Sequence, residues 1–215
     1  AINWMTAGRG IVHSERKPER LKADTYVNHG LQLWAALPQA HEEIEPSFEH
    51  TPAGGIPQVV EQGVAVRVLV GEAFGARSPV KTLSQTIYLD IALPAGGRFE
   101  LPALAPELAM YAVDADVRVN GEAIPAHTMA VLPDGQGAVL ACDTAARLMV
   151  IGGEPLDGPR YITWNFVSSR RERILEAGSD WAAQRMGHVP GETEFIPLPG
   201  KPFGVREPDV GTTPV

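Results

Sequence analysis

The sequence has little of what several protein classes require. Its single cysteine, Cys142, cannot form a disulfide within the chain. No apolar run is long enough to cross a bilayer, and 18 Lys and Arg residues are outnumbered by 26 Asp and Glu residues. Nonspecific nucleic-acid binding depends on clustered Lys and Arg, so the net charge of −8 disfavours it. We therefore expect a cytoplasmic protein that binds neither nucleic acid nor membrane.

Several catalytic motifs are also missing. The sequence contains no P-loop, no glycine fingerprint for dinucleotides and no G-x-S-x-G elbow. Cys142 would need a nearby histidine to act as a nucleophile, and we interpret it as a buried, inert thiol. The one basic cluster, residues 170–173, is short and is interrupted by Glu172, so we interpret it as the solvated first turn of a helix.

Glycine and proline are abundant, with 22 and 19 residues, and they separate short apolar runs. Residues 64–70, 86–91 and 148–151 have the length and composition of buried strands between turns. This pattern is typical of barrels and sandwiches and predicts an all-β fold.

One helix is expected near the C-terminal end. Ser169 and Glu172 have the spacing of a capping box, apolar residues follow at helical intervals, and Gly187 can end the helix. We expect this helix to pack on a β-barrel. Beyond it, residues 200–215 are rich in Pro and Gly, which is typical of a mobile tail.

The strongest candidate for chemistry lies at the start of the chain. Gly8 and Gly10 predict a turn, and His13 and Glu15 follow two residues apart, so that on a strand both point to one face. Imidazole and carboxylate ligands suit non-haem ferrous iron. Alternatively, His13 is a hydrogen-bonded or surface residue and Glu15 a solvated or salt-bridged carboxylate. Its candidate partners are then Arg9, Arg16 and Lys17.

An internal repeat indicates which half of the chain carries this chemistry. The segment with His13 and Glu15 aligns without gaps to residues 132–142, where the same positions hold Leu140 and Cys142. The second copy would therefore have its metal positions filled by an apolar side chain and a thiol. We expect two similar units with one metal site.

Other candidate groups are weaker. His41 opens an acidic stretch that ends at Glu45, but it lacks the second histidine of H-E-x-x-H, so we interpret it as a solvated connection. Trp34 is expected in the core, and the role of Trp4 stays open. The remaining isolated histidines are interpreted as surface or turn residues. They are His29, His127 and His188.

Four segments together resemble one known family. They are residues 4–15, 30–38 (GLQLWAALP), 153–156 (GEPL) and 164–169 (WNFVSS). The sequence resembles the pirins, which are two-domain cupins. The resemblance implies tandem cupin (bicupin) β-barrels, the first incomplete, followed by a tail that contains a helix. The implied parts are 1–75 (end of the metal-binding cupin), 76–153 (a cupin without metal ligands), 154–199 (tail with a helix packing on the barrels) and 200–215 (mobile tail).

The resemblance also implies a ligand set. In pirins three histidines and one glutamate bind iron, and the last two ligands match His13 and Glu15. The first two form an H-x-H pair, which we expect upstream of Ala1. We therefore interpret the chain as an N-terminally truncated piece of a longer protein.

The implied activity is that of an iron-dependent dioxygenase of the quercetin 2,3-dioxygenase type, acting on a flavonol-like aromatic molecule. The expected cofactor is Fe(II), although other divalent metals are compatible with these ligands. Glu15 would act as both ligand and catalytic base. The alternative is a non-catalytic, iron-dependent regulatory protein that binds other proteins, and the sequence does not separate the two.

Overall fold

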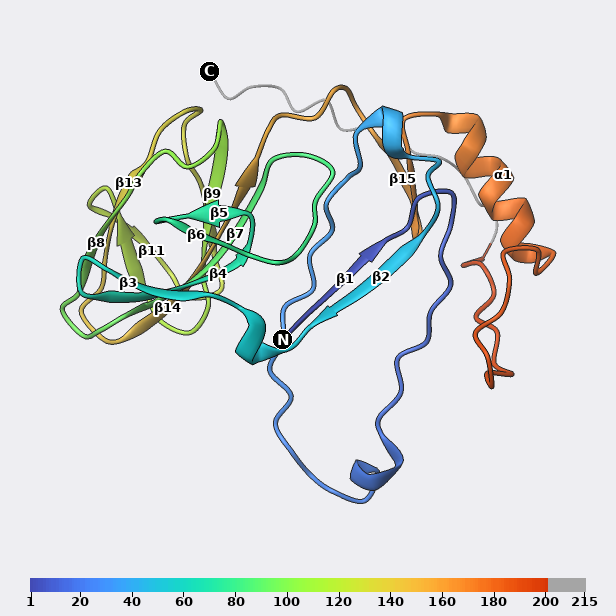
Figure 1. Ribbon diagram of the computed structural model, residues 1–215, viewed down its shortest axis with the longest axis horizontal. Coiled ribbons are helices and arrows are strands. Elements are labelled where there is room, and N and C mark those ends of the chain that lie inside the picture. The colour runs from blue at the N-terminus through green and yellow to red at the C-terminus, as the bar shows by residue number, and fades with distance from the viewer. Residues whose placement is uncertain (201–215) are drawn as a thin grey trace. The chain divides into compact units, whose positions relative to one another are not determined.

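The computed structural model describes residues 1–200 and is mostly β-structure with one α-helix near its C-terminal end (Figure 1). It divides into two compact units, each made of two stretches of chain. Unit 1 contains Ala1–Met5 and Phe48–Pro155, and unit 2 contains Thr6–Ser47 and the described residues 156–200. The tail expected at 200–215 lies outside the described residues, apart from Gly200.

A six-stranded antiparallel sheet forms one layer of unit 1. Its strands in spatial order are β12 (Met129–Val131), β9 (Glu107–Ala112), β14 (Ala146–Gly153), β7 (Thr86–Leu93), β4 (Val64–Val70) and β3 (Gln58–Glu61). The three strands expected at 64–70, 86–91 and 148–151 are therefore confirmed as β4, β7 and β14. They occupy adjacent central positions, where both faces of a sheet are most readily covered.

A four-stranded antiparallel sheet forms the facing layer. Its order is β11 (Glu122–Ile124), β10 (Val117–Val119), β13 (Ala138–Ala141) and β8 (Arg98–Leu101). Apolar residues from the inner faces of both sheets make one continuous core, which includes the fully buried Leu89, Phe99 and Leu140. Side chains fill the interior of this cupin-type unit. The expected domain boundaries stay a prediction, while the six-stranded sheet itself begins at Gln58.

The side chain of Gln62, at the β3–β4 turn of one sheet, forms hydrogen bonds with the edge strand β8 of the other. Its Nε2 donates to the carbonyl oxygen of Glu100 at 2.9 Å, and its Oε1 accepts from the Glu100 amide at 2.8 Å. The amide side chain thus reproduces both hydrogen bonds of a strand neighbour at the edge of β8. This satisfies backbone groups that an edge strand would otherwise leave unpaired.

Short elements complete the chain. Two further pairs of strands are β1 (Ile2–Thr6) with β2 (Ser47–Thr51), and β5 (Glu72–Ala73) with β6 (Ala76–Arg77). Three single turns of 3₁₀ helix are η1 (Glu19–Leu21), η2 (Gln39–His41) and η3 (Ala53–Gly55).

In unit 2 a hairpin of β15 (Tyr161–Thr163) and β16 (Phe166–Ser168) packs against α1 (Arg171–Ala182). The ring centroids of Trp164 and Trp181 lie 5.2 Å apart across this contact. The helix was expected, but its ends differ. Arg170 occupies the N-cap without a side-chain cap, so the capping box is wrong, and the helix ends at Ala182, five residues before Gly187.

A buried polar network explains the missing cap. Both Ser169 Oγ and Ser169 N donate to the Glu42 carboxylate at 2.9 Å, and Ser168 Oγ donates to it at 3.0 Å. Arg160 Nε lies 2.7 Å from the same carboxylate, and the two side chains are only 4% and 9% exposed. A hydrogen bond from Arg160 also lowers the pKa of Asp157. The interpretation of this acidic stretch as solvated is therefore wrong for Glu42.

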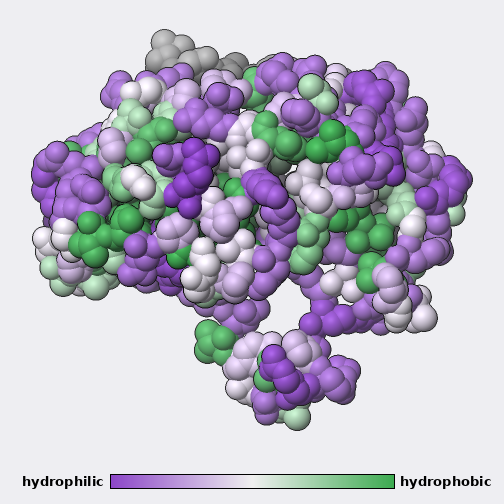
Figure 2. All heavy atoms as spheres, viewed as in Figure 1, coloured by the Kyte–Doolittle hydropathy of each residue, from purple (hydrophilic) through white to green (hydrophobic). Residues whose placement is uncertain are grey.

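One expectation about buried side chains is wrong. Trp34 is 58% exposed, so its expected place in the core is wrong, whereas His29, His127 and His188 are exposed as predicted. On the face shown in Figure 2, apolar side chains form small groups separated by hydrophilic ones. Within residues 1–200, no helix combines the length and apolar character that crossing a membrane requires.

Candidate metal centre

The candidate ligands follow a glycine turn at the end of β1. Gly8 and Gly10 have φ angles of +51° and +143°, in the region that favours glycine. Gly10 N donates to Ala7 O at 2.9 Å, and Arg9 N donates to Ile44 O at 3.0 Å. A Cβ on Gly8 would lie 2.1 Å from that same Ile44 oxygen. The turn predicted from the sequence is therefore confirmed, and Gly8 is required by both its backbone angles and its close neighbour.

The segment after the turn is not a strand. Residues 11–18 carry no strand assignment, and His13 and Glu15 are both exposed. A strand requires a hydrogen-bonded neighbour, and this stretch has no ladder partner among the described residues. The expectation that His13 and Glu15 lie on a strand is therefore wrong, because this segment has no sheet pairing among the described residues.

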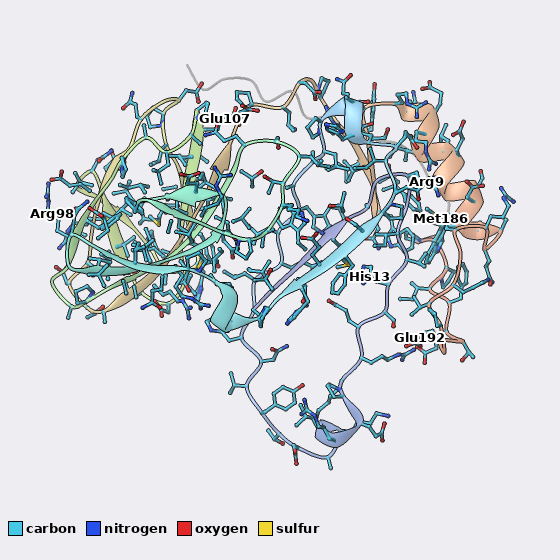
Figure 3. All side chains as sticks on the ribbon, in the orientation of Figure 1. Arg9, His13, Arg98, Glu107, Met186 and Glu192 are labelled. Carbon is cyan, nitrogen blue, oxygen red and sulfur yellow. The ribbon has the colours of Figure 1, made fainter. Side chains whose placement is uncertain are left out.

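The residues that alternate with the candidate ligands, Ser14 and Arg16, both form hydrogen bonds with Glu192. Ser14 Oγ and Arg16 Nε each donate to Glu192 Oε1 at 2.9 Å, and Arg16 Nη2 donates to Glu192 Oε2. These hydrogen bonds, first from Arg16 and then from Ser14, lower the pKa of Glu192. Figure 3 shows the segment running between the labelled His13 and Glu192. Ser14 and Arg16 thus share one partner, whereas His13 and Glu15 are exposed.

The three cations considered as partners of Glu15 are all engaged elsewhere. Arg9 forms an ion pair with Glu45, and Arg16 binds Glu192. Lys17 donates to the backbone oxygen of Asp24 at 2.7 Å. Among residues 1–200, neither Glu15 nor His13 has a hydrogen-bond or ion-pair partner. The salt-bridged alternative for Glu15 is therefore not what the structure shows.

These two side chains fit a metal ion by type. An imidazole nitrogen and a carboxylate oxygen, both with free lone pairs, are donors that suit ferrous iron. The described part of the chain contains no group of three or more His, Cys, Asp or Glu side chains that could hold a metal ion. His13 and Glu15 thus correspond to two of the four ligands that the family resemblance implies.

The positions that correspond to His13 and Glu15 in the second copy hold buried side chains. Leu140 is fully buried in β13, and Cys142 is buried, with its Sγ 3.2 Å from Pro94 O. Both belong to the core cluster between the two sheets of unit 1. The predicted filling of these positions is confirmed, and Cys142 is a packed thiol.

The sequence did not indicate the C-terminal side chains that touch the segment with the candidate ligands. Glu192 binds Ser14 and Arg16. The Met186 methyl group is 2.8 Å from the position that a Cβ on Gly10 would take. Both residues lie in the loop after α1. Glu192 is 178 positions away from Ser14 in the sequence. No local motif could have found them.

The chain is similar to known proteins of one family. The model of the pirin C-terminal cupin domain matches residues 88–187, and the pirin model matches residues 1–35. A pirin-like protein of Caulobacter vibrioides is 43% identical over 201 residues, covering 92% of this chain and 69% of that protein. A putative quercetin 2,3-dioxygenase of Pseudomonas aeruginosa is 33% identical, covering 84% of this chain and 56% of that protein.

A solved structure shows the same fold. Quercetin 2,3-dioxygenase from Acinetobacter baumannii superimposes with a TM-score of 0.78 at 26% identity, covering 86% of this chain and 66% of that one. The chain thus spans between 56% and 69% of the length of these relatives. On the family-model matches and the similarity to the Caulobacter protein, the chain belongs to the pirin family.

Proposed function

We propose that this protein contributes to an iron-dependent dioxygenase of the quercetin 2,3-dioxygenase type, with His13 and Glu15 as two of the metal ligands. The observation that carries the proposal is that both side chains are exposed, lie two residues apart and have no other partner among the described residues. The names of the Pseudomonas and Acinetobacter relatives support this reaction class. A flavonol-like aromatic molecule with a free hydroxyl group is the proposed substrate.

Ferrous iron, when bound, would supply Lewis acidity that polarises an aromatic hydroxyl. The protein groups then have separate tasks. The His13 imidazole donates a nitrogen lone pair, and one Glu15 carboxylate oxygen does the same. The second Glu15 oxygen accepts the proton of the substrate hydroxyl, leaving an electron-rich ring that can react with dioxygen. Glu15 is thus proposed as both ligand and base.

The test uses protein expressed from the complete coding sequence and loaded anaerobically with ferrous iron. Quercetin and dioxygen are added, and both flavonol absorbance and oxygen concentration are followed. We expect parallel consumption of the two. Glu15→Gln preserves the shape of the side chain but removes its basicity, so the rate per bound iron should fall by about 10²–10⁴, the usual contribution of a general base.

Glu19→Gln is the matched control, because it makes the same change in charge on a side chain that is 84% exposed and that, within residues 1–200, pairs only with Lys22. Its rate should stay within twofold of wild type. A Glu15→Gln protein with full iron and unchanged turnover would contradict the assigned base. If fully metallated wild type turns over neither flavonols nor catechols, and one protein partner is recovered repeatedly, the regulatory alternative is favoured instead.

A further inference from the structure

One carboxylate holds both residues that alternate with the candidate ligands. Glu192 accepts hydrogen bonds from Ser14 Oγ and from two nitrogens of Arg16. Ser14 lies between His13 and Glu15, and Arg16 follows Glu15 directly. Holding residues 14 and 16 therefore restrains the backbone on both sides of Glu15 and next to His13.

We propose that Glu192 is a positioning residue for the metal ligands, an inference that rests on the function proposed above. It does not touch the metal-binding side chains. It acts through Ser14 and Arg16, which set the rotation of the backbone that carries His13 and Glu15. Without sheet pairing at residues 11–18, side-chain contacts are the available means of holding this orientation.

The same C-terminal region also contacts the turn before the ligands. Arg173 Nη2 donates to Arg9 O at 2.8 Å, and Met186 packs against Gly10. The labelled side chains of Arg9 and Met186 lie close together in Figure 3. The glycine turn and the ligand segment are therefore held at successive points by residues from α1 and the loop that follows it. Of these contacts, those of Glu192 involve the residues adjacent to the candidate ligands, Ser14 and Arg16.

The neighbouring Glu194 provides a contrast. It contacts Arg16 Nη1 at 3.1 Å, and its side chain is 75% exposed, whereas that of Glu192 is 23% exposed. No hydrogen bond joins Glu194 to Ser14 among the described residues. The two carboxylates thus have the same charge and nearly the same place, but only Glu192 binds both alternating residues.

The test compares Glu192→Gln with Glu194→Gln, which make the same change in charge, in protein from the complete coding sequence. Two quantities are measured: the dissociation constant for ferrous iron by anaerobic titration, and the ¹⁵N order parameters of the amides at positions 13 and 15. Loss of groups that orient metal ligands typically weakens binding by 10–100-fold. We expect Glu192→Gln to weaken iron binding by about tenfold and to lower the order parameters below about 0.6, with Tm unchanged.

Glu194→Gln should leave both quantities within error of wild type. Arg16→Gln should reproduce the effect of Glu192→Gln, and the double variant should be no worse than either, because the two side chains act as one unit. If wild type binds iron and Glu192→Gln has wild-type affinity and order, the positioning role is wrong while the proposed function stands. If wild type binds no ferrous iron, the proposed function fails and this inference fails with it.

Discussion

Leu140→Ala should destabilise unit 1 strongly without loss of bound metal. The side chain is fully buried, and its neighbours across the sheet are Phe99 on β8 and Val119 on β10. The substitution removes three carbon atoms, worth about 2.4 kcal/mol of transfer free energy at ~0.8 kcal/mol each. Paired strands on both sides restrict collapse around the cavity, which adds to the cost. We expect a loss of about 3–4 kcal/mol in the free energy of unfolding.

The assay is urea denaturation followed by far-UV circular dichroism, in which the large sheets of unit 1 dominate. Val131→Ala is the control, since Val131 is an apolar β-strand residue that is 79% exposed, and its cost should be below about 0.5 kcal/mol. A shift for Leu140→Ala of less than about 1 kcal/mol, or one equal to the control, would refute the assignment of this position to a filled core.

Three further predictions concern other parts of the chain. Glu42→Ala should cost about 3 kcal/mol in a thermal melt, because it leaves the Arg160 guanidinium buried with one carboxylate fewer, whereas the exposed Glu45→Ala should cost below about 1 kcal/mol. Gly8→Ala should cost about 1–3 kcal/mol by the same melt, from backbone strain and a clash with a facing carbonyl oxygen; an unchanged Tm would contradict the turn. Burial first, and then a nearby carboxylate, raise the pKa of Tyr88 to about 12 from 10.0. The neutral Tyr88 hydroxyl should contribute fully to stability below pH 10.0, and this contribution should be lost as the pH rises to about 12. Because Tyr88→Phe has no group that ionises there, its free energy of unfolding should fall less than that of wild type over this range.

Local patterns predicted three central strands of unit 1, because these strands are defined by local features. The run Val64–Val70 alternates inward-facing valines with other residues, and turns with glycine bound it on both sides. The same reasoning found β7 and β14. The helix was also found, because its apolar residues recur at helical spacing and Ile174 is buried.

The errors arose where distant residues override a local preference. Ser169 has the sequence context of an N-cap, but its hydroxyl donates to Glu42, 127 positions away. Trp34 is large and apolar, which favours burial, but it lies on a segment without strand or helix in the described chain. For the candidate site, the residue types of His13 and Glu15 were readable, but the Glu192 contacts depend on the tertiary fold and left no signal in the sequence.

The most direct test of the account is the iron content of purified His13→Ala beside wild type, both expressed from the complete coding sequence and loaded with ferrous iron under identical conditions. The account predicts about one iron per wild-type chain, and a large loss in His13→Ala with the fold retained, because the exposed imidazole is a ligand and contributes little to packing. Stoichiometric iron in the His13→Ala protein would contradict the assignment of the metal to this segment.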